Sequence, residues 1–205
     1  MSGIIYSHIR NNIMEDFKMS MKEAFDNYFY KLNEYWKEEG KYPKTVYMKE
    51  CDVKGGIYLP NTIDEFGYVQ WQPVLQTLPV DFAQLESELG FKIHKSIKEF
   101  HSIYWFERIE CLFSGRNNMW IDGVLPYNAC SPEAVLKNLK NGFDNCMEDY
   151  LNDDIYFEIG GADLGGIYVN NTTGKVFIAD VYEQVTFYIA NSIESLLNLF
   201  GGKNE

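Results

Sequence analysis

The spacing of hydrophobic residues changes from a helical period to a strand period along this chain of 205 residues. From about residue 12 to residue 39, apolar side chains recur every three or four positions, which is typical of an amphipathic helix. From Tyr68 to Pro73, polar and apolar residues alternate one by one, as in a half-buried strand closed by a proline. A chain that carries both periods combines helices with sheet, so the sequence predicts an α+β fold.

Capping signals predict further helices. Asp81 can cap a short helix, and another is expected over residues 95–104. Ser131, followed by a proline and an acid, predicts a third helix start. Asn191 stands three residues before Glu194, which is the spacing of a capping box for a closing helix.

Short β-prone runs in the second half of the chain predict an antiparallel sheet made largely of hairpins. The expected strands are residues 109–113, 119–121, 155–159, 167–169 and 176–178. Residues 115–118 and 170–174 have turn composition and would close two hairpins. The glycine-rich residues 160–166 lack the Gly-Lys-Ser/Thr ending of a phosphate loop, so we expect a flexible loop or wide turn there.

The chain shows no internal repeat, linker or low-complexity tract. We therefore expect one domain over residues 12–205, with helices at its amino-terminal, middle and carboxy-terminal parts packed on a mainly antiparallel sheet. Residues 1–11 carry no clear pattern and are expected to form a flexible arm.

The charge balance limits the kinds of partner. Lys and Arg total 18 against 30 Asp and Glu, which gives a formal net charge of −12. Nucleic acids and anionic lipid surfaces are polyanions, so both are disfavoured as direct partners. A basic protein remains a suitable partner.

The cysteines and the amino terminus point to the cytoplasm. Cys51, Cys111, Cys130 and Cys146 lie far apart, and buried free thiols are the expected state. No secretory leader and no apolar run of about 20 residues is present, so we expect no spanning helix.

Catalytic motifs are scarce. His94 and His101 are seven residues apart, whereas metal-ligating pairs on a helix more often use three or four, so ordinary packing histidines are the favoured interpretation. No serine or cysteine lies in a nucleophile signature. We expect no enzyme activity, cofactor or metal site, although a hydrolase whose site is assembled in space stays open as an alternative.

One acidic segment stands out. No Lys or Arg occurs between Lys140 and Lys175, whereas seven acids do. Such a segment can attract a basic partner, and adjacent tyrosines can serve as interface anchors. The alternative is an acidic face that only promotes solubility. The candidate partner-binding residues are Asp144, Glu148, Asp149, Tyr150, Asp153, Asp154, Tyr156, Glu158 and Asp163.

Several segments resemble the Syd family of the SUKH superfamily of small bacterial α/β proteins. They are Tyr35-Trp36, Tyr68-Val69-Gln70-Trp71-Gln72-Pro73, Leu85-Glu86-Ser87-Glu88-Leu89-Gly90 with Ile97-Lys98-Glu99-Phe100, and Ala190-Asn191-Ser192-Ile193-Glu194-Ser195-Leu196-Leu197. The resemblance implies a non-enzymatic binding protein. Relatives in the superfamily are immunity proteins encoded beside polymorphic toxins, and Syd itself associates with the SecY translocon.

Two binding functions follow as hypotheses. The first is an immunity protein that occludes a cognate toxin domain. The second is a peripheral factor that binds the cytoplasmic loops of SecY, reaching the membrane only through that protein. An acidic surface suits a basic toxin and basic loops equally, so the sequence leaves both open.

Overall fold

The computed structural model describes residues 19–40, 42–49, 56–107, 109–114, 120–125, 131–144, 154–163, 165–180 and 185–199. The helices are α1 (Met21–Glu39), α2 (Phe82–Leu89), α3 (Lys95–Phe100), α4 (Pro132–Asp144) and α5 (Ile193–Leu199). The strands are β1 (Lys44–Val46), β2 (Tyr68–Gln70), β3 (Val74–Leu75), β4 (Tyr104–Trp105), β5 (Ile109–Ser114), β6 (Trp120–Leu125), β7 (Tyr156–Ala162), β8 (Gly165–Asn170), β9 (Val176–Asp180) and β10 (Val185–Ala190). The predicted α+β class is confirmed.

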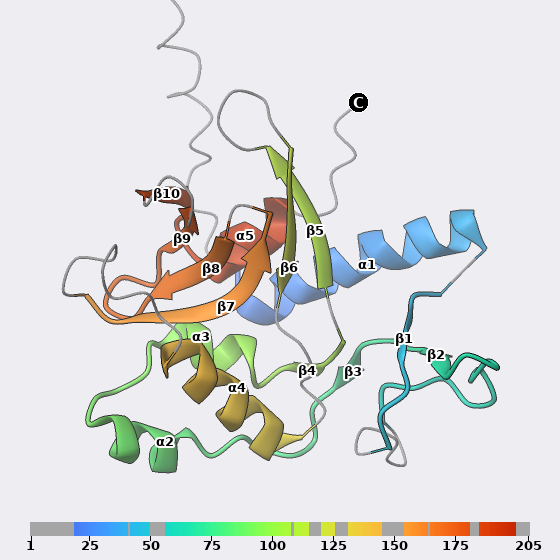
Figure 1. Ribbon diagram of the computed structural model, residues 1–205, viewed down its shortest axis with the longest axis horizontal. Coiled ribbons are helices and arrows are strands. Elements are labelled where there is room, and N and C mark those ends of the chain that lie inside the picture. The colour runs from blue at the N-terminus through green and yellow to red at the C-terminus, as the bar shows by residue number, and fades with distance from the viewer. Residues whose placement is uncertain are drawn as a thin grey trace, which may run out of the picture.

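A six-stranded antiparallel sheet forms the centre of the fold, in the order β10-β9-β8-β7-β6-β5 (Figure 1). Both expected hairpins are present, because β5 pairs with β6 and β8 pairs with β9. The turn expected at residues 115–118 lies outside the described residues. The strand order follows the chain order throughout, so each strand in the sheet pairs with its neighbours in sequence.

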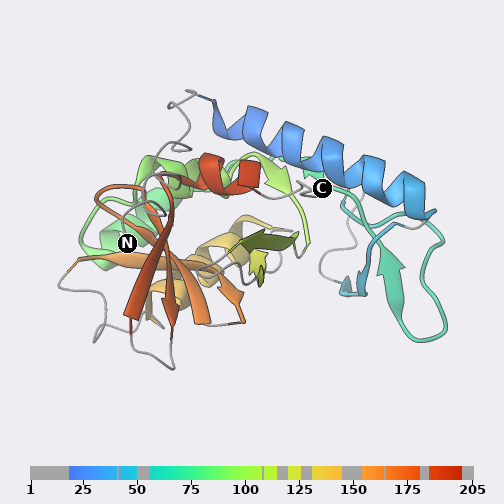
Figure 2. The same cartoon turned by 90° about the horizontal axis from the view of Figure 1, so that it is seen from above.

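Alternate residues of the sheet contribute to two different apolar layers. Phe157 of β7 lies opposite Val169 of β8, which lies opposite Val176 of β9, and all three side chains belong to the main core. The helices α1 and α5 lie together along one side of the sheet (Figure 2). The other residues of these strands form a small second cluster.

Four of the six aromatic residues of α1 pack into the main core, namely Phe25, Tyr28, Phe29 and Trp36. Phe25 is fully buried, with its ring centroid 5.3 Å from that of Phe100 and 5.5 Å from that of Phe106. The helix begins at Met21, because Ser20 and Glu23 form a reciprocal capping box there. The expectation of a helix start near residue 12 is therefore wrong, since a residue that caps a helix is not itself helical; residues 12–18 lie outside the described part.

The alternating segment Tyr68–Pro73 belongs to a separate small sheet. Val69 and Trp71 are buried while Tyr68 is exposed, so the predicted alternation is confirmed. However, among the described strands β2 pairs with β1 alone, and Trp71 forms a bridge with Tyr58. Figures 1 and 2 show β1 and β2 at the opposite end of the molecule from β10.

The structure corrects several element boundaries. Residues 160–166 are largely strand, because β7 and β8 continue through the glycines to pair Ala162 with Gly165. The helix expected over 95–104 ends at Phe100, since Tyr104 already pairs with β3. Ser192, not Asn191, caps α5 by accepting a hydrogen bond from the Ser195 backbone N–H at 3.2 Å.

Candidate binding surface

The structure describes five of the nine predicted binding residues. Asp144 ends α4, Asp154 and Tyr156 lie at the start of β7, Glu158 lies within β7, and Asp163 follows its end. The side chains of Asp144, Asp154 and Asp163 are exposed. The other four, Glu148, Asp149, Tyr150 and Asp153, lie outside the described residues.

A glycine brings the end of α4 against β7. A Cβ atom on Gly142 would lie 2.5 Å from the carbonyl oxygen of Glu158, so only a residue without a side chain fits here. Asp144 follows two residues later and therefore lies on the element that packs beside Glu158. The packing of α4 on β7 therefore places the end of this helix beside the middle of the strand.

Glu158 is the half-buried member of this acidic group. Burial raises the pKa of its carboxyl group above the usual value. It lies directly opposite Tyr168 in the β7–β8 ladder, and no hydrogen bond or ion pair to its side chain is present within the described residues. A partner's cation placed beside it would favour the ionised form.

Asp154 has a structural contact that the sequence did not reveal. Its carboxylate accepts a hydrogen bond of 3.1 Å from the side-chain amide of Asn170. The carbonyl oxygen of that amide in turn accepts from the backbone N–H groups of Thr172 and Thr173. Asp154 therefore helps to hold the β8–β9 turn, whatever its exposed face binds.

Tyr156 is not an exposed anchor. Only 8% of its surface is accessible, and it packs with Tyr168 and Ala179 in the second cluster, 5.9 Å from the ring of Phe177. Its burial therefore removes the argument for partner binding that rested on this tyrosine. Its position on the sheet face beside Tyr168, Ala179 and Phe177 explains its burial.

The acidic residues do not form one compact patch. Asp154 and Asp163 lie at opposite ends of β7, roughly 30 Å apart for an extended strand at about 3.3 Å per residue. Glu158 lies between them, nearer to Asp154. The chain carries no Lys or Arg between residues 141 and 174, so no basic residue of this stretch balances these acids.

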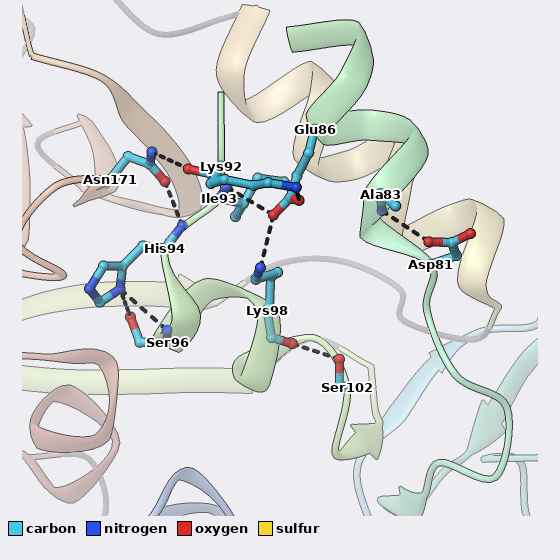
Figure 3. A network of polar contacts seen from close by, with 10 residues as sticks. All are labelled: Asp81, Ala83, Glu86, Lys92, Ile93, His94, Ser96, Lys98, Ser102 and Asn171. Atoms are coloured by element: carbon cyan, nitrogen blue, oxygen red, sulfur yellow. Dashed lines mark hydrogen bonds and ion pairs between the residues drawn. The ribbon is translucent and has the colours of Figure 1, made fainter. Parts of the chain in front are cut away.

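A second polar cluster is centred on Glu86 (Figure 3). The Glu86 side chain is only 6% exposed and bonds Lys92 at 2.7 Å and Lys98 at 2.8 Å. It also accepts from the backbone N–H of Ile93. Hydrogen bonds from the two lysines lower the pKa of Glu86 to about 2.

The buried position of Glu86 was not predicted, although the sequence carries a signal for it. Glu86 follows Phe82 by four residues and precedes Leu89 by three, so it lies on the apolar stripe of α2. An acid on such a stripe needs donors nearby, and three lysines follow within twelve residues. Glu86 on α2 accepts from three donors, and one of them is on α3, so this cluster holds the two helices together.

Asn171 connects the Glu86 cluster to the sheet. Its side-chain oxygen accepts from the His94 backbone N–H at 2.7 Å, and its nitrogen donates to the Lys92 carbonyl at 2.9 Å (Figure 3). The His94 ring bonds Ser96 and caps the start of α3. The β8–β9 turn is thus fastened to the segment between α2 and α3.

The two helix-associated histidines occupy structural positions. His94 caps the start of α3, and His101 caps its end. Burial alone lowers the pKa of His101 to about 4, so it is neutral near pH 7. Within the described residues, no group of three or more His, Cys, Asp and Glu side chains could hold a metal ion.

The fold defines a small mixed α+β protein. Comparison with protein families matches residues 21–142 to the family described as Syd protein (SUKH-2). Because this match covers more than half of the chain, the chain belongs to the Syd (SUKH-2) family. Comparison with curated proteins finds no match.

The family match ends before the acidic strand. It spans the elements from α1 to α4 and stops at Gly142, so Glu158 and the rest of β7 lie beyond it. The closing helix α5, which also carries part of the resemblance, lies beyond it as well. Among the described helices, none combines the length and the apolar character needed to cross a membrane.

Proposed function

We propose that this chain is a non-enzymatic protein-binding module that works in the cytoplasm as an immunity protein and neutralises a cognate toxin by occlusion. The observation that carries the proposal is the acidic group of α4 and β7, by which we mean Asp144 at the end of α4, Asp154 just before β7 and Glu158 within β7. No basic residue from the same stretch of chain balances these charges. A basic toxin surface would be attracted to this group and would satisfy the carboxylate of Glu158.

Membership of the Syd family supports a second candidate, a cytoplasmic factor that binds SecY. This candidate uses the same chemistry, because the basic cytoplasmic loops of a translocon would meet the same carboxylates. The two candidates differ in the partner alone. Pull-down from the source cells, at low and at moderate salt, separates them: recovery of a toxin domain encoded beside this chain supports the first, and recovery of SecY supports the second.

The binding surface is tested with a double variant, Asp144→Asn with Glu158→Gln. This pair avoids Asp154, whose contact with Asn170 makes it a poor probe of binding. The matched control is Glu38→Gln with Glu65→Gln, two exposed acids outside this surface whose loss changes the net charge equally.

Association rates with the recovered partner are then measured by stopped flow at several salt concentrations. We expect the double variant to associate about tenfold more slowly at low salt and to show a flatter salt dependence than the control. Equal rates and equal salt slopes for the two double variants would place the contact elsewhere.

A further inference from the structure

The small sheet of β1 and β2 differs from the rest of the molecule in charge. Residues 41–76 contain four lysines and four acids, so this region is neutral and the net charge of −12 is carried by the rest of the chain. Two copies of the chain repel each other over most of their surfaces. They can approach at this region without bringing an excess of like charge together.

The same region carries most of the exposed apolar side chains. Eleven large hydrophobic side chains are exposed in the described part of the chain, and six of them fall within residues 41–76. These six are Tyr42, Val46, Ile63, Phe66, Tyr68 and Leu75. Clustered exposed apolar surface is typical of a protein interface.

Val46 and Tyr68 form the apolar face of this small sheet. They lie directly opposite each other in the β1–β2 ladder, and are 58% and 44% exposed. Phe66, at the loop before β2, is 78% exposed. The lysine of this face, Lys44, is held in an ion pair of 2.8 Å with Asp64.

No described strand pairs with the outer edge of β1. Trp71 donates to the carbonyl of Pro43, and Tyr47 donates to the carbonyl of Gly67, so the odd-numbered residues of this strand face β2. The backbone groups of Lys44 and Val46 therefore point away from β2. Within the described residues no hydrogen bond reaches them, and an unpaired edge of this kind is a template for another strand.

We propose that a second copy of this chain covers this edge, with the two β1 strands paired antiparallel about a two-fold axis at Thr45. The axis sets Lys44 of one copy opposite Val46 of the other, so no like charges face each other. The outward N–H and C=O groups of both residues then form four hydrogen bonds between the copies. Each Val46 side chain lies between Tyr68 of its own copy and the aliphatic stem of Lys44 of the second copy.

The size of the patch sets the strength of this contact. The exposed parts of Val46, Phe66 and Tyr68 amount to roughly 350 Å² on each copy, which is below the roughly 800 Å² per partner of a stable complex. We therefore expect a reversible dimer that forms at micromolar or higher concentration. Its formation leaves the acidic group of α4 and β7 free, because the small sheet lies at the other end of the molecule (Figure 2).

Sedimentation velocity of the full chain, from about 1 to about 500 µM at roughly 150 mM salt, tests the proposal. The informative variant is Val46→Pro, because it removes an outward N–H while keeping the β1–β2 bonds. The control is Ile63→Thr, since Ile63 lies on the loop of the same region and is 52% exposed. Tyr68→Thr, which removes an exposed ring only, is a second probe if the proline variant does not fold.

We expect the wild type to dimerise reversibly and Val46→Pro to raise the dissociation constant at least tenfold, with Tyr68→Thr weakening it by a smaller factor. Ile63→Thr should stay within about twofold of the wild type. A wild type that remains monomeric over the whole range overturns the proposal. So does a folded edge variant that dimerises like the wild type, or a control that weakens the dimer as much as Val46→Pro does.

Discussion

Replacing Glu86 with glutamine should remove a stabilising contribution that depends on pH. The folded-state pKa of Glu86 is about 2, against 4.5 for an unperturbed carboxyl. Between these values the unfolded chain binds more protons than the folded one. The stability from this group is therefore fully present above about pH 4.5 and is lost as the pH falls towards 2.

The difference between the folded-state pKa and the unperturbed pKa of Glu86 would correspond to about 3 kcal/mol of stability if the whole cluster were shielded from water. Lys92 is 83% exposed, however, so water screens its interaction, whereas Lys98 is 33% exposed and the carboxylate itself is buried. We therefore expect Glu86→Gln to lower the free energy of unfolding by about 1–2 kcal/mol at neutral pH. The amide can still accept from Ile93, which keeps the loss below that of a fully broken pair.

Urea unfolding followed by tryptophan fluorescence, repeated from about pH 7 to about pH 2, measures both effects. The matched control is Glu88→Gln, which removes an exposed acid two residues away that pairs with Lys140. The stability curves of Glu86→Gln and wild type should converge at low pH, while Glu88→Gln should run nearly parallel to wild type. A Glu86→Gln variant that loses stability between about pH 4.5 and 2 as steeply as wild type would refute the reasoning.

Three further changes should alter stability. His101 is buried and neutral with a pKa of about 4, so the free energy of unfolding of the wild type should fall by up to about 3 kcal/mol as the pH drops from 6.5 to 4. In urea unfolding over the same pH range, His101→Leu should show a weaker dependence of stability on pH. Gly142→Ala places a Cβ against the Glu158 carbonyl and should cost about 1–3 kcal/mol in thermal unfolding, whereas Gly161→Ala, with open space around it, should cost under about 1 kcal/mol. Ser20→Ala removes the capping box of α1 and should cost about 1 kcal/mol; unchanged melting would contradict its role.

Sequence patterns located most elements because the signals were local. The cap of Asp81 on α2 and that of Ser131 on α4 are both made to backbone groups three residues away or fewer, and both are confirmed. β10 had no such signal, because its Val-Thr-Phe-Tyr-Ile run lacks a turn of clear composition before it. Partner strands, not local sequence, decide whether such a run becomes an edge strand.

The positions of polar groups were harder to predict than the elements. Glu86 is bonded to Lys92 and Lys98 from a different helix and loop, and Asp154 is bonded to Asn170 from another strand. Such pairs depend on how elements pack, which hydrophobic spacing does not encode. Tyr156 illustrates the same point, since alternation along a strand assigns it to one face without saying whether that face is covered.

The acidic group of α4 and β7 and the region of β1 and β2 differ in charge, and this difference affects both proposed interactions. Seven of the 30 acids fall between residues 144 and 163 with no Lys or Arg among them, while the neutral region of β1 and β2 lies at the far end of the fold. A protein whose acidic surface attracts a basic partner would otherwise repel copies of itself, and the neutral end is where that repulsion is weakest. A dimer formed there would present two acidic surfaces facing outward, so that each copy could hold its own partner. Raising the salt concentration should then weaken partner binding but not the contact between copies, which separates the two interactions in one titration.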